Sequence, residues 1–251
     1  MSSSIWTECA GESRLKPLRL SPWRAVEAQH LVSTRKLVDS IEEQATLEDL
    51  IEASKPRQPG GGRLHVLLAT PFRCPPLKHG SRFGGRHEPG LWYGAEGHRA
   101  LFAEVAYYRL LFLDGTAADL GIVATWHTAF TVRVRTERGI DLTRSPFRAH
   151  RDAIASPVTY EQAQALGQAM REAGVEAFRY PSARDRQGGV NVAVFTPAAF
   201  GAARPRQLET WHCSATRQTV EFVRHDFSGA STFTFPRDEF VVNGRLPAPA
   251  V

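Results

Sequence analysis

The apolar residues after residue 63 come in short runs that glycine and proline separate from one another. A short apolar run between turn residues is typical of a buried strand, whereas apolar residues spaced three and four apart are typical of a helix. Both patterns occur here, and the 20 glycines and 16 prolines lie between apolar runs rather than in a low-complexity tract. The sequence therefore predicts an α+β fold in which strands after residue 63 pack against a few helices.

Individual helices and strands can be placed from these patterns. We expect helices at residues 98–113 and 163–173, because each has apolar residues on one side and a glycine behind its end, Gly115 or Gly174. The spacing from Thr159 to Gln162 predicts a capping box before the second helix. The segments with a strand pattern are residues 64–70, 91–93, 124–136, 175–180, 190–196, 219–224 and 231–235.

The first part of the chain has a different pattern. Residues 1–20 are polar and poorly patterned, so we expect a loosely docked lead-in. Apolar residues then recur at helical spacing and predict two amphipathic helices between about residues 24 and 54. The stretch KPRQPGGGR at residues 55–63 interrupts any regular element. We therefore expect an extension at residues 1–62, mostly helical from about residue 24, and a catalytic domain at residues 63–251.

Length and charge limit the function only loosely. A chain of 251 residues with 42% hydrophobic residues can bury one substantial core. The net charge of +5 suits DNA, RNA, an acidic protein or a diphosphate-bearing molecule. No long basic run chooses among these, and the interspersed charges are equally typical of a solvated surface.

The cysteines and the N-terminal sequence indicate in which cellular compartment the protein is expected. Cys9, Cys74 and Cys213 fit neither a disulfide framework nor a zinc-binding spacing. The chain has no 18-residue apolar stretch, and its N-terminus lacks the basic start and apolar segment of a secretory signal. We expect a cytoplasmic protein with reduced thiols and no membrane span.

The segment at residues 70–104 is the most informative. Common motifs are absent, among them the nucleophile elbow, the phosphate-binding P-loop and the dinucleotide fingerprint. In their place, TPFRCPPLKHGSRFGGRHEPGLWYGAEGHRALFAE combines arginines, glycines, an aromatic pair and a glutamate on a predicted helix.

This segment resembles the first half of a RES domain, a family named for an Arg, a Glu and a Ser and found as the toxin in bacterial toxin–antitoxin pairs. In that family a first strand carries an Arg, a glycine-bounded loop carries a second Arg, an aromatic-Tyr strand follows, and a helix bears the Glu. The matching positions here are Arg73, Arg82, Tyr93 and Glu104. Arg86 is an alternative to Arg82 for the loop position.

The second half of the family pattern is similar to YPSARDRQGGVNVAVF, which contains Ser182 and Asn191. The resemblance covers about residues 64–200, with weaker similarity in WRAVEAQHLVSTRKLVDS near the front. It implies a fold similar to ADP-ribosyltransferases, in which a split β core with flanking helices grips NAD⁺. It also implies that NAD⁺ is the substrate rather than a bound cofactor, and that the nicotinamide–ribose bond is cleaved.

The resemblance assigns roles to the matching residues. Glu104, Arg82 and Ser182 are the implied catalytic residues, with Glu104 facing the cationic ribose that forms as neutral nicotinamide leaves. This chemistry requires neither a general acid nor a metal. The residues implied in NAD⁺ binding are Arg73, Arg82, Tyr93, Ser182 and Asn191, the arginines for the diphosphate and Tyr93 for the nicotinamide or its ribose.

Three questions stay open at this level. The ADP-ribosyl group can pass to water or to phosphate, or to a cellular protein as the main alternative. A nucleic-acid-binding module is the alternative from another class, although direct nucleic-acid binding is not expected of a RES toxin. The resemblance further implies an Xre-type antitoxin partner, with either a homodimer or a toxin–antitoxin hetero-oligomer as the assembly.

Overall fold

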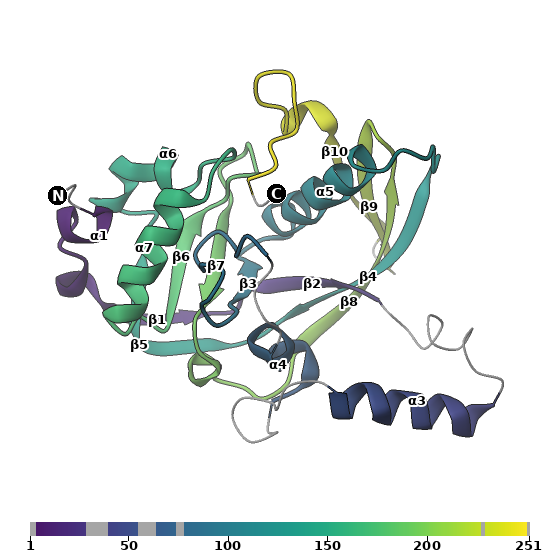
Figure 1. Ribbon diagram of the computed structural model, residues 1–251, viewed down its shortest axis with the longest axis horizontal. Coiled ribbons are helices and arrows are strands. Elements are labelled where there is room, and N and C mark those ends of the chain that lie inside the picture. Colours follow the sequence, from purple (N-terminus) through teal and green to yellow (C-terminus); the bar gives the residue numbers. More distant parts are fainter. Residues whose placement is uncertain (1–3, 29–39, 55–63, 74–77, 227–228, 250–251) are drawn as a thin grey trace.

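The computed structural model describes residues 4–28, 40–54, 64–73, 78–226 and 229–249 (Figure 1). Ten strands of this part of the chain form one sheet, in the order β1-β5-β6-β7-β3-β2-β4-β8-β9-β10. The strands are β1 (Lys16–Leu20), β2 (Trp23–Glu27), β3 (Trp92–Ala95), β4 (Val123–Thr131), β5 (Val134–Asp141), β6 (Ala177–Pro181), β7 (Val190–Val194), β8 (Arg206–Ala215), β9 (Thr219–Asp226) and β10 (Gly229–Pro236). The helices are α1 (Ile5–Glu8), α3 (Ile41–Ser54), α4 (Val66–Arg73), α5 (His98–Asp114), α6 (Arg151–Ile154) and α7 (Glu161–Glu172). The predicted α+β class is confirmed.

The sheet divides into two halves between β3 and β2. Trp23 on β2 pairs with Ala95 on β3, and this is the only backbone pairing between these two described strands. The backbones meet closely at this point, because a Cβ atom on Gly94 would lie 2.5 Å from the carbonyl oxygen of Trp23. Beyond it, β2 continues along β4 and β3 continues along β7. The halves therefore diverge and leave room for a cavity between them.

Helices α5 and α7 cover one face of the sheet, and α4 covers the other. Alternate residues of a strand point to opposite faces. On β3, Ala95 packs in the core with α5 and Tyr93 packs against the core with α7, whereas Trp92 points to the opposite core with α4. Within the α5 core, Phe102 stacks on Phe222 of β9 with 4.4 Å between ring centroids. The two cores on the first face thus flank the point where the sheet divides.

Helices α5 and α7 lie where the sequence predicts them. Helix α5 ends before Gly115, and α7 is followed by Gly174 with a φ of +71°, both as expected. The predicted capping box is wrong: Tyr160 is the N-cap of α7, and no side chain caps it. The strands expected at residues 91–93, 175–180, 190–196, 219–224 and 231–235 are confirmed within a few residues, and 124–136 is divided between β4 and β5.

The strand expected at residues 64–70 is wrong, because this run forms the helix α4. Leu68 and Ala69 are fully buried, whereas Val66 is 44% exposed, so the segment buries one side as a surface helix does. The Thr70 hydroxyl donates a hydrogen bond to the Val66 carbonyl, four residues back. A short apolar run is compatible with a strand or with a helix. Here the packing of one side against the sheet selects the helix.

The prediction of the first N-terminal helix is also wrong for the residues at its start. Residues Trp23–Glu27 form β2, and their backbones pair with β4 from Thr131 to His127. Long-range pairing therefore overrides a local helical spacing. The rest of that expected helix, residues 29–39, and the expected domain boundary at residues 62 and 63 lie outside the described residues. The second expected helix is present as α3.

The lead-in was expected to be loosely docked, but its described part, residues 4–20, packs against the rest of the structure. Ile5 and Trp6 are each 8% exposed, and the Trp6 ring lies 6.2 Å from that of Phe147 between centroids. Strand β1 pairs with β5 and forms one edge of the sheet. The buried side chains of Ile5 and Trp6 hold this otherwise polar segment against the core. No helix within the described ranges is both long and apolar enough to cross a membrane.

Candidate active site

A cavity of about 360 Å³ opens where the halves of the sheet diverge, between α5 and the start of α7. Its wall contains one carboxylate, two arginines and four tyrosines. The cavity is lined by Arg24, Ala25, Ser81, Arg82, Tyr93, Gly94, Ala95, Leu101, Glu104, Val105, Tyr108, Tyr160, Tyr180 and Asn191. The structure thus brings together four of the residues singled out in the sequence, namely Arg82, Tyr93, Glu104 and Asn191.

Glu104 is held by hydrogen bonds from two other elements. It projects from α5, and its Oε1 accepts a hydrogen bond of 2.7 Å from Nδ2 of Asn191 on β7. The same oxygen accepts a hydrogen bond of 3.3 Å from the hydroxyl of Ser182. Asn191 is 1% exposed, and its Oδ1 has no hydrogen-bond partner among the described residues. A carboxylate oxygen is therefore held by a buried side chain whose own acceptor has no partner among the described residues.

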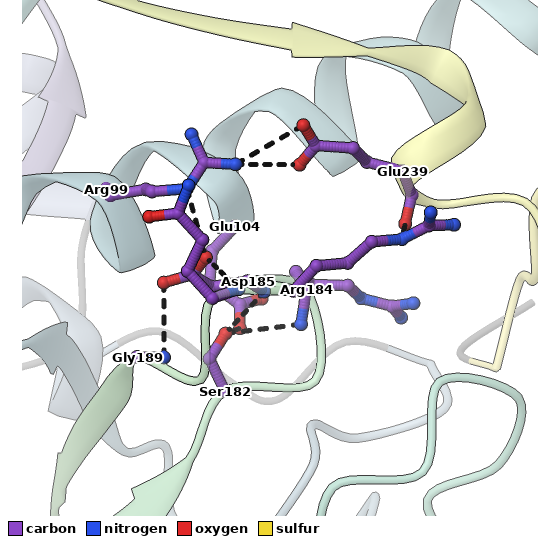
Figure 2. A network of polar contacts seen from close by, with 9 residues as sticks. Arg99, Glu104, Ser182, Arg184, Asp185, Gly189 and Glu239 are labelled. Atoms are coloured by element: carbon purple, nitrogen blue, oxygen red, sulfur yellow. Dashed lines mark hydrogen bonds and ion pairs between the residues drawn. The ribbon is translucent and has the colours of Figure 1, made fainter.

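The loop after β6 fixes Ser182. Its Oγ accepts hydrogen bonds from the backbone N–H groups of Arg184 at 3.2 Å and Asp185 at 3.1 Å, which directs the hydroxyl proton toward Glu104 (Figure 2). Asp185 in turn accepts from Nε of Arg99 at 3.2 Å, and Arg99 also reaches Glu239 at 3.0 Å. Ser182 contacts Glu104 as the sequence pattern implies, without itself lining the cavity.

Arg82 lines the part of the cavity near the start of α7. Its Nη1 donates a hydrogen bond of 2.8 Å to the Ser156 carbonyl, and its guanidinium lies 4.8 Å from the centre of the Tyr160 ring. Arg82 is 6% exposed, whereas Arg86 is exposed and does not line the cavity. The geometry therefore favours Arg82 over Arg86 as the loop arginine.

The Tyr93 hydroxyl is tied to the loop that carries Arg82. It accepts a hydrogen bond of 3.1 Å from the Phe83 N–H and shares one of 2.8 Å with the Ser81 hydroxyl. Burial raises the pKa of Tyr93 to about 12, so the phenol stays neutral at physiological pH. Tyr93 thus positions the loop while presenting its ring to the cavity.

Arg24 is a site residue that sequence reasoning missed. It lies on β2, its Nη1 donates a hydrogen bond of 2.7 Å to the Tyr93 carbonyl, and its Nε has no partner among the described residues. Desolvation lowers the pKa of Arg24 to about 10, which leaves the group charged at neutral pH. The side chain replaces the backbone pairing that ends one residue earlier at Trp23. The signal was present in the Trp-Arg-Ala-Val-Glu segment, which we interpreted as helical.

Arg73 does not lie where the family pattern requires it. It is buried at the end of α4, on a helix rather than a first strand, and it does not line the cavity. Of the two arginines that line the cavity, Arg24 is the one that lies on a strand. Three tyrosines were also missed, because Tyr108, Tyr160 and Tyr180 are distant in sequence and had no motif to mark them.

This arrangement can bind a molecule that carries both positive and negative charge. Glu104 supplies negative charge at one side, and Arg24 and Arg82 supply positive charge at others, while tyrosine rings provide flat apolar surface between them. A fixed carboxylate near such rings can stabilise a cation that develops on a bound ligand.

The match to a protein-family model agrees with the sequence pattern. A model of the RES domain family matches residues 60–216, more than half of the chain and including Arg82, Tyr93, Glu104, Ser182 and Asn191. The crystal structure of the M. tuberculosis MbcT–MbcA toxin–antitoxin complex is similar, with 15% sequence identity, coverage of 84% of this chain and 91% of that chain, and a TM-score of 0.47. A comparison with curated proteins finds no match. On the family match, this chain belongs to the RES domain family.

Proposed function

We propose that this protein cleaves the nicotinamide–ribose bond of NAD⁺. The observation that carries the proposal is the Glu104 carboxylate, which Asn191 and Ser182 hold in place at the wall of a cavity that also contains Arg24 and Arg82. Cleavage of this bond requires a fixed negative charge near the sugar, and the diphosphate of the substrate requires cations.

In the proposed reaction, the bond between the ribose C1′ and the nicotinamide nitrogen breaks, and its electron pair leaves with nicotinamide. Because nicotinamide leaves as a neutral molecule, no general acid is needed. Positive charge develops on the ribose, where the Glu104 carboxylate stabilises it. An acceptor oxygen then bonds to C1′. Water gives ADP-ribose and releases a proton, whereas inorganic phosphate gives the 1-phosphate ester of ADP-ribose.

The cavity residues fit the parts of this substrate. Tyr93, Tyr108 and Tyr160 offer ring faces to the nicotinamide and its ribose. The unpartnered Oδ1 of Asn191 can accept a hydrogen bond from a ribose hydroxyl or from the carboxamide. Arg24 and Arg82 supply positive charge for the diphosphate. These residues bind and orient NAD⁺, and no protein group forms a covalent bond with it.

The biological role that we propose is that of a toxin in a bacterial toxin–antitoxin module. The support for this role is membership of the RES domain family, to which toxins of such modules belong. The partner would be an Xre-type antitoxin encoded beside it. The toxin would act in the cytoplasm, and the resulting loss of NAD⁺ would stop the growth of the cell. Transfer of ADP-ribose to a cellular protein is the alternative fate of the same intermediate.

A product assay tests the activity. Purified protein is incubated with NAD⁺ labelled in the ADP-ribose part, with and without phosphate, together with a bacterial protein extract in a third arm. We expect release of nicotinamide with free ADP-ribose, its phosphate ester, or labelled protein, and each product identifies one acceptor.

Matched variants separate the enzyme from the alternatives. Glu104→Gln keeps the shape of the side chain and one oxygen that can accept from Asn191 and Ser182, but removes the charge; it should abolish nicotinamide release while the melting temperature stays close to that of the parent. Glu172→Gln, an exposed change of the same kind on α7, should leave activity intact. Salt-sensitive nucleic-acid binding by both parent and Glu104→Gln, without NAD⁺ loss, would overturn the proposal in favour of a nucleic-acid-binding module.

A further inference from the structure

Arg184 is a buried arginine that the proposed chemistry does not use. Its side chain is 2% exposed and stacks on Tyr107, with the guanidinium carbon 3.5 Å from the ring centre. Nη1 donates a hydrogen bond of 3.2 Å to the Pro157 carbonyl. Nε and Nη2 are buried and have no hydrogen-bond partner among the described residues.

The two unpartnered nitrogens form one edge of the guanidinium. The N–H bonds of Nε and Nη2 point in the same direction, and this edge binds two oxygens of one phosphate or carboxylate at once. No other described arginine leaves both nitrogens of this edge buried and without a partner. A buried cation whose two-pronged donor edge is unpaired is unfavourable, so an anionic ligand is its natural complement.

Two carboxylates connected to this loop, Asp185 and Glu104, already accept hydrogen bonds from other partners. Asp185, the next residue, accepts from Arg99 and from the backbone of Gln187 and Gly189 (Figure 2). Glu104 accepts from Asn191 and Ser182. The anion that satisfies Arg184 must therefore come from outside these described groups.

Arg184 is also directly connected to the candidate active site. Its backbone N–H donates to the Ser182 hydroxyl, which donates to Glu104. On the other side of this loop lies a hollow of about 320 Å³, whose lining includes Pro157, Ser182 and Ala183. Arg184 itself lines neither the cavity nor this hollow, but its neighbours in the loop on both sides, Ala183 and Asp185, line the hollow.

We propose that Arg184 binds a phosphate group beside Glu104, through its Nε and Nη2 edge. This inference rests on the proposed NAD⁺ cleavage and adds a binding residue to it. Two sources share the chemistry: the diphosphate of NAD⁺, and inorganic phosphate that accepts the ADP-ribosyl group. If phosphate is the acceptor, one of its oxygens bonds to C1′ as the bond to nicotinamide breaks, and Arg184 holds the other oxygens.

Anion-dependent melting gives a test that needs no enzymatic activity. Melting temperatures are measured with sodium phosphate, pyrophosphate or ADP-ribose against sodium chloride at equal ionic strength. The parent protein should be stabilised by at least one of the three anions. Arg184→Gln and Arg184→Lys should lose most of that shift, since neither side chain has the two-pronged edge and the lysine keeps the charge. Arg148→Gln, an exposed change that removes the same charge, should keep the shift.

Enzyme kinetics then show whether Arg184 binds the diphosphate of NAD⁺ or inorganic phosphate. If Arg184 binds the diphosphate, Arg184→Lys should raise the KM for NAD⁺ at least tenfold with or without phosphate. If it binds the acceptor, the variant should lose phosphate-stimulated turnover while hydrolysis and the KM for NAD⁺ stay unchanged.

Several outcomes would overturn the inference. One is a parent protein that none of the three anions stabilises, which requires no variant. Another is a pair of Arg184 variants that melt at lower temperature but keep the full anion-dependent shift, as a purely structural arginine would. A parent protein that responds to anions through Arg184 but does not consume NAD⁺ would support the phosphate site and refute the proposed function.

Discussion

Asn191 Nδ2 lies 2.7 Å from Glu104 Oε1, so one hydrogen bond connects strand β7 to the carboxylate on helix α5. Both residues line the same cavity, and Asn191 is almost fully buried. This bond determines where the carboxylate charge lies relative to the tyrosine rings.

Asn191→Ala should therefore lower the rate of NAD⁺ cleavage without unfolding the protein. A hydrogen bond to a charged group contributes about 1.5–3 kcal/mol, which corresponds to a loss of roughly 10- to 100-fold in kcat. Initial rates of nicotinamide release measure the effect, and Gln187→Ala, which removes an exposed amide in the neighbouring loop, is the control. An unchanged kcat would show that Asn191 does not position Glu104.

The network around Arg99 should affect the same reaction from a distance. Glu239 and Asp185 share Arg99, and the backbone of Asp185 holds the Ser182 hydroxyl (Figure 2). Glu239→Ala should loosen this loop and lower kcat severalfold while the KM for NAD⁺ changes little, because Glu239 does not line the cavity. Asp238→Ala, on the adjacent exposed residue, should have no effect. Equal behaviour of the two variants would refute the role of the network.

Substitutions of Arg24 and Arg73 should differ in their effect on substrate binding, because only Arg24 lines the cavity. Arg24→Lys removes the guanidinium that donates to the Tyr93 carbonyl, and it should raise the KM for NAD⁺ about tenfold or more. Arg73→Lys, outside the cavity, should leave KM unchanged even if it lowers the melting temperature. The reverse result would restore Arg73 to the site.

Gly167 on α7 should not tolerate a side chain. A Cβ atom there would lie 2.2 Å from the backbone carbonyl oxygen of Phe83, next to Arg82. Gly167→Ala should destabilise the fold by about 1–3 kcal/mol, since the backbone must shift to relieve the overlap. Gly115→Ala places its Cβ atom no closer than 3.5 Å to the Leu111 carbonyl and should be neutral. Urea denaturation of both variants measures the difference, and equal unfolding free energies would contradict it.

Stability should fall on acidification because of His127. Burial lowers the pKa of His127 from 6.5 to about 4, so the imidazole stays neutral in the folded protein. The unfolded chain takes up a proton near pH 6.5, and unfolding is therefore favoured increasingly as the pH falls from 6.5 to 4. The contribution is at most about 3 kcal/mol and is absent above this window.

His127→Leu removes this titration. Its unfolding free energy should fall less steeply than that of the parent between pH 6.5 and 4, and the two pH profiles should run parallel above pH 7. Profiles that stay parallel through the acidic range would show that His127 is not held neutral.

Local patterns predicted the elements that carry much of the site. Helix α5 with Glu104, strand β3 with Tyr93, and strands β6 and β7 around Ser182 and Asn191 follow from apolar periodicity and from glycine stops. The family pattern then related these residues to one reaction. Such signals are readable because each element buries a regular set of its own side chains.

The amino-acid sequence by itself determined the α+β class, the helix of Glu104 and four of the residues in the cavity, namely Arg82, Tyr93, Glu104 and Asn191. Only the tertiary structure decided that Trp23–Glu27 is a strand, that Val66–Arg73 is a helix, and that Arg24 rather than Arg73 lines the cavity. The reason is that a short segment satisfies several local conformations about equally well. Hydrogen bonds to β4, and burial of one side of α4 against the sheet, involve partners that no window of neighbouring residues contains.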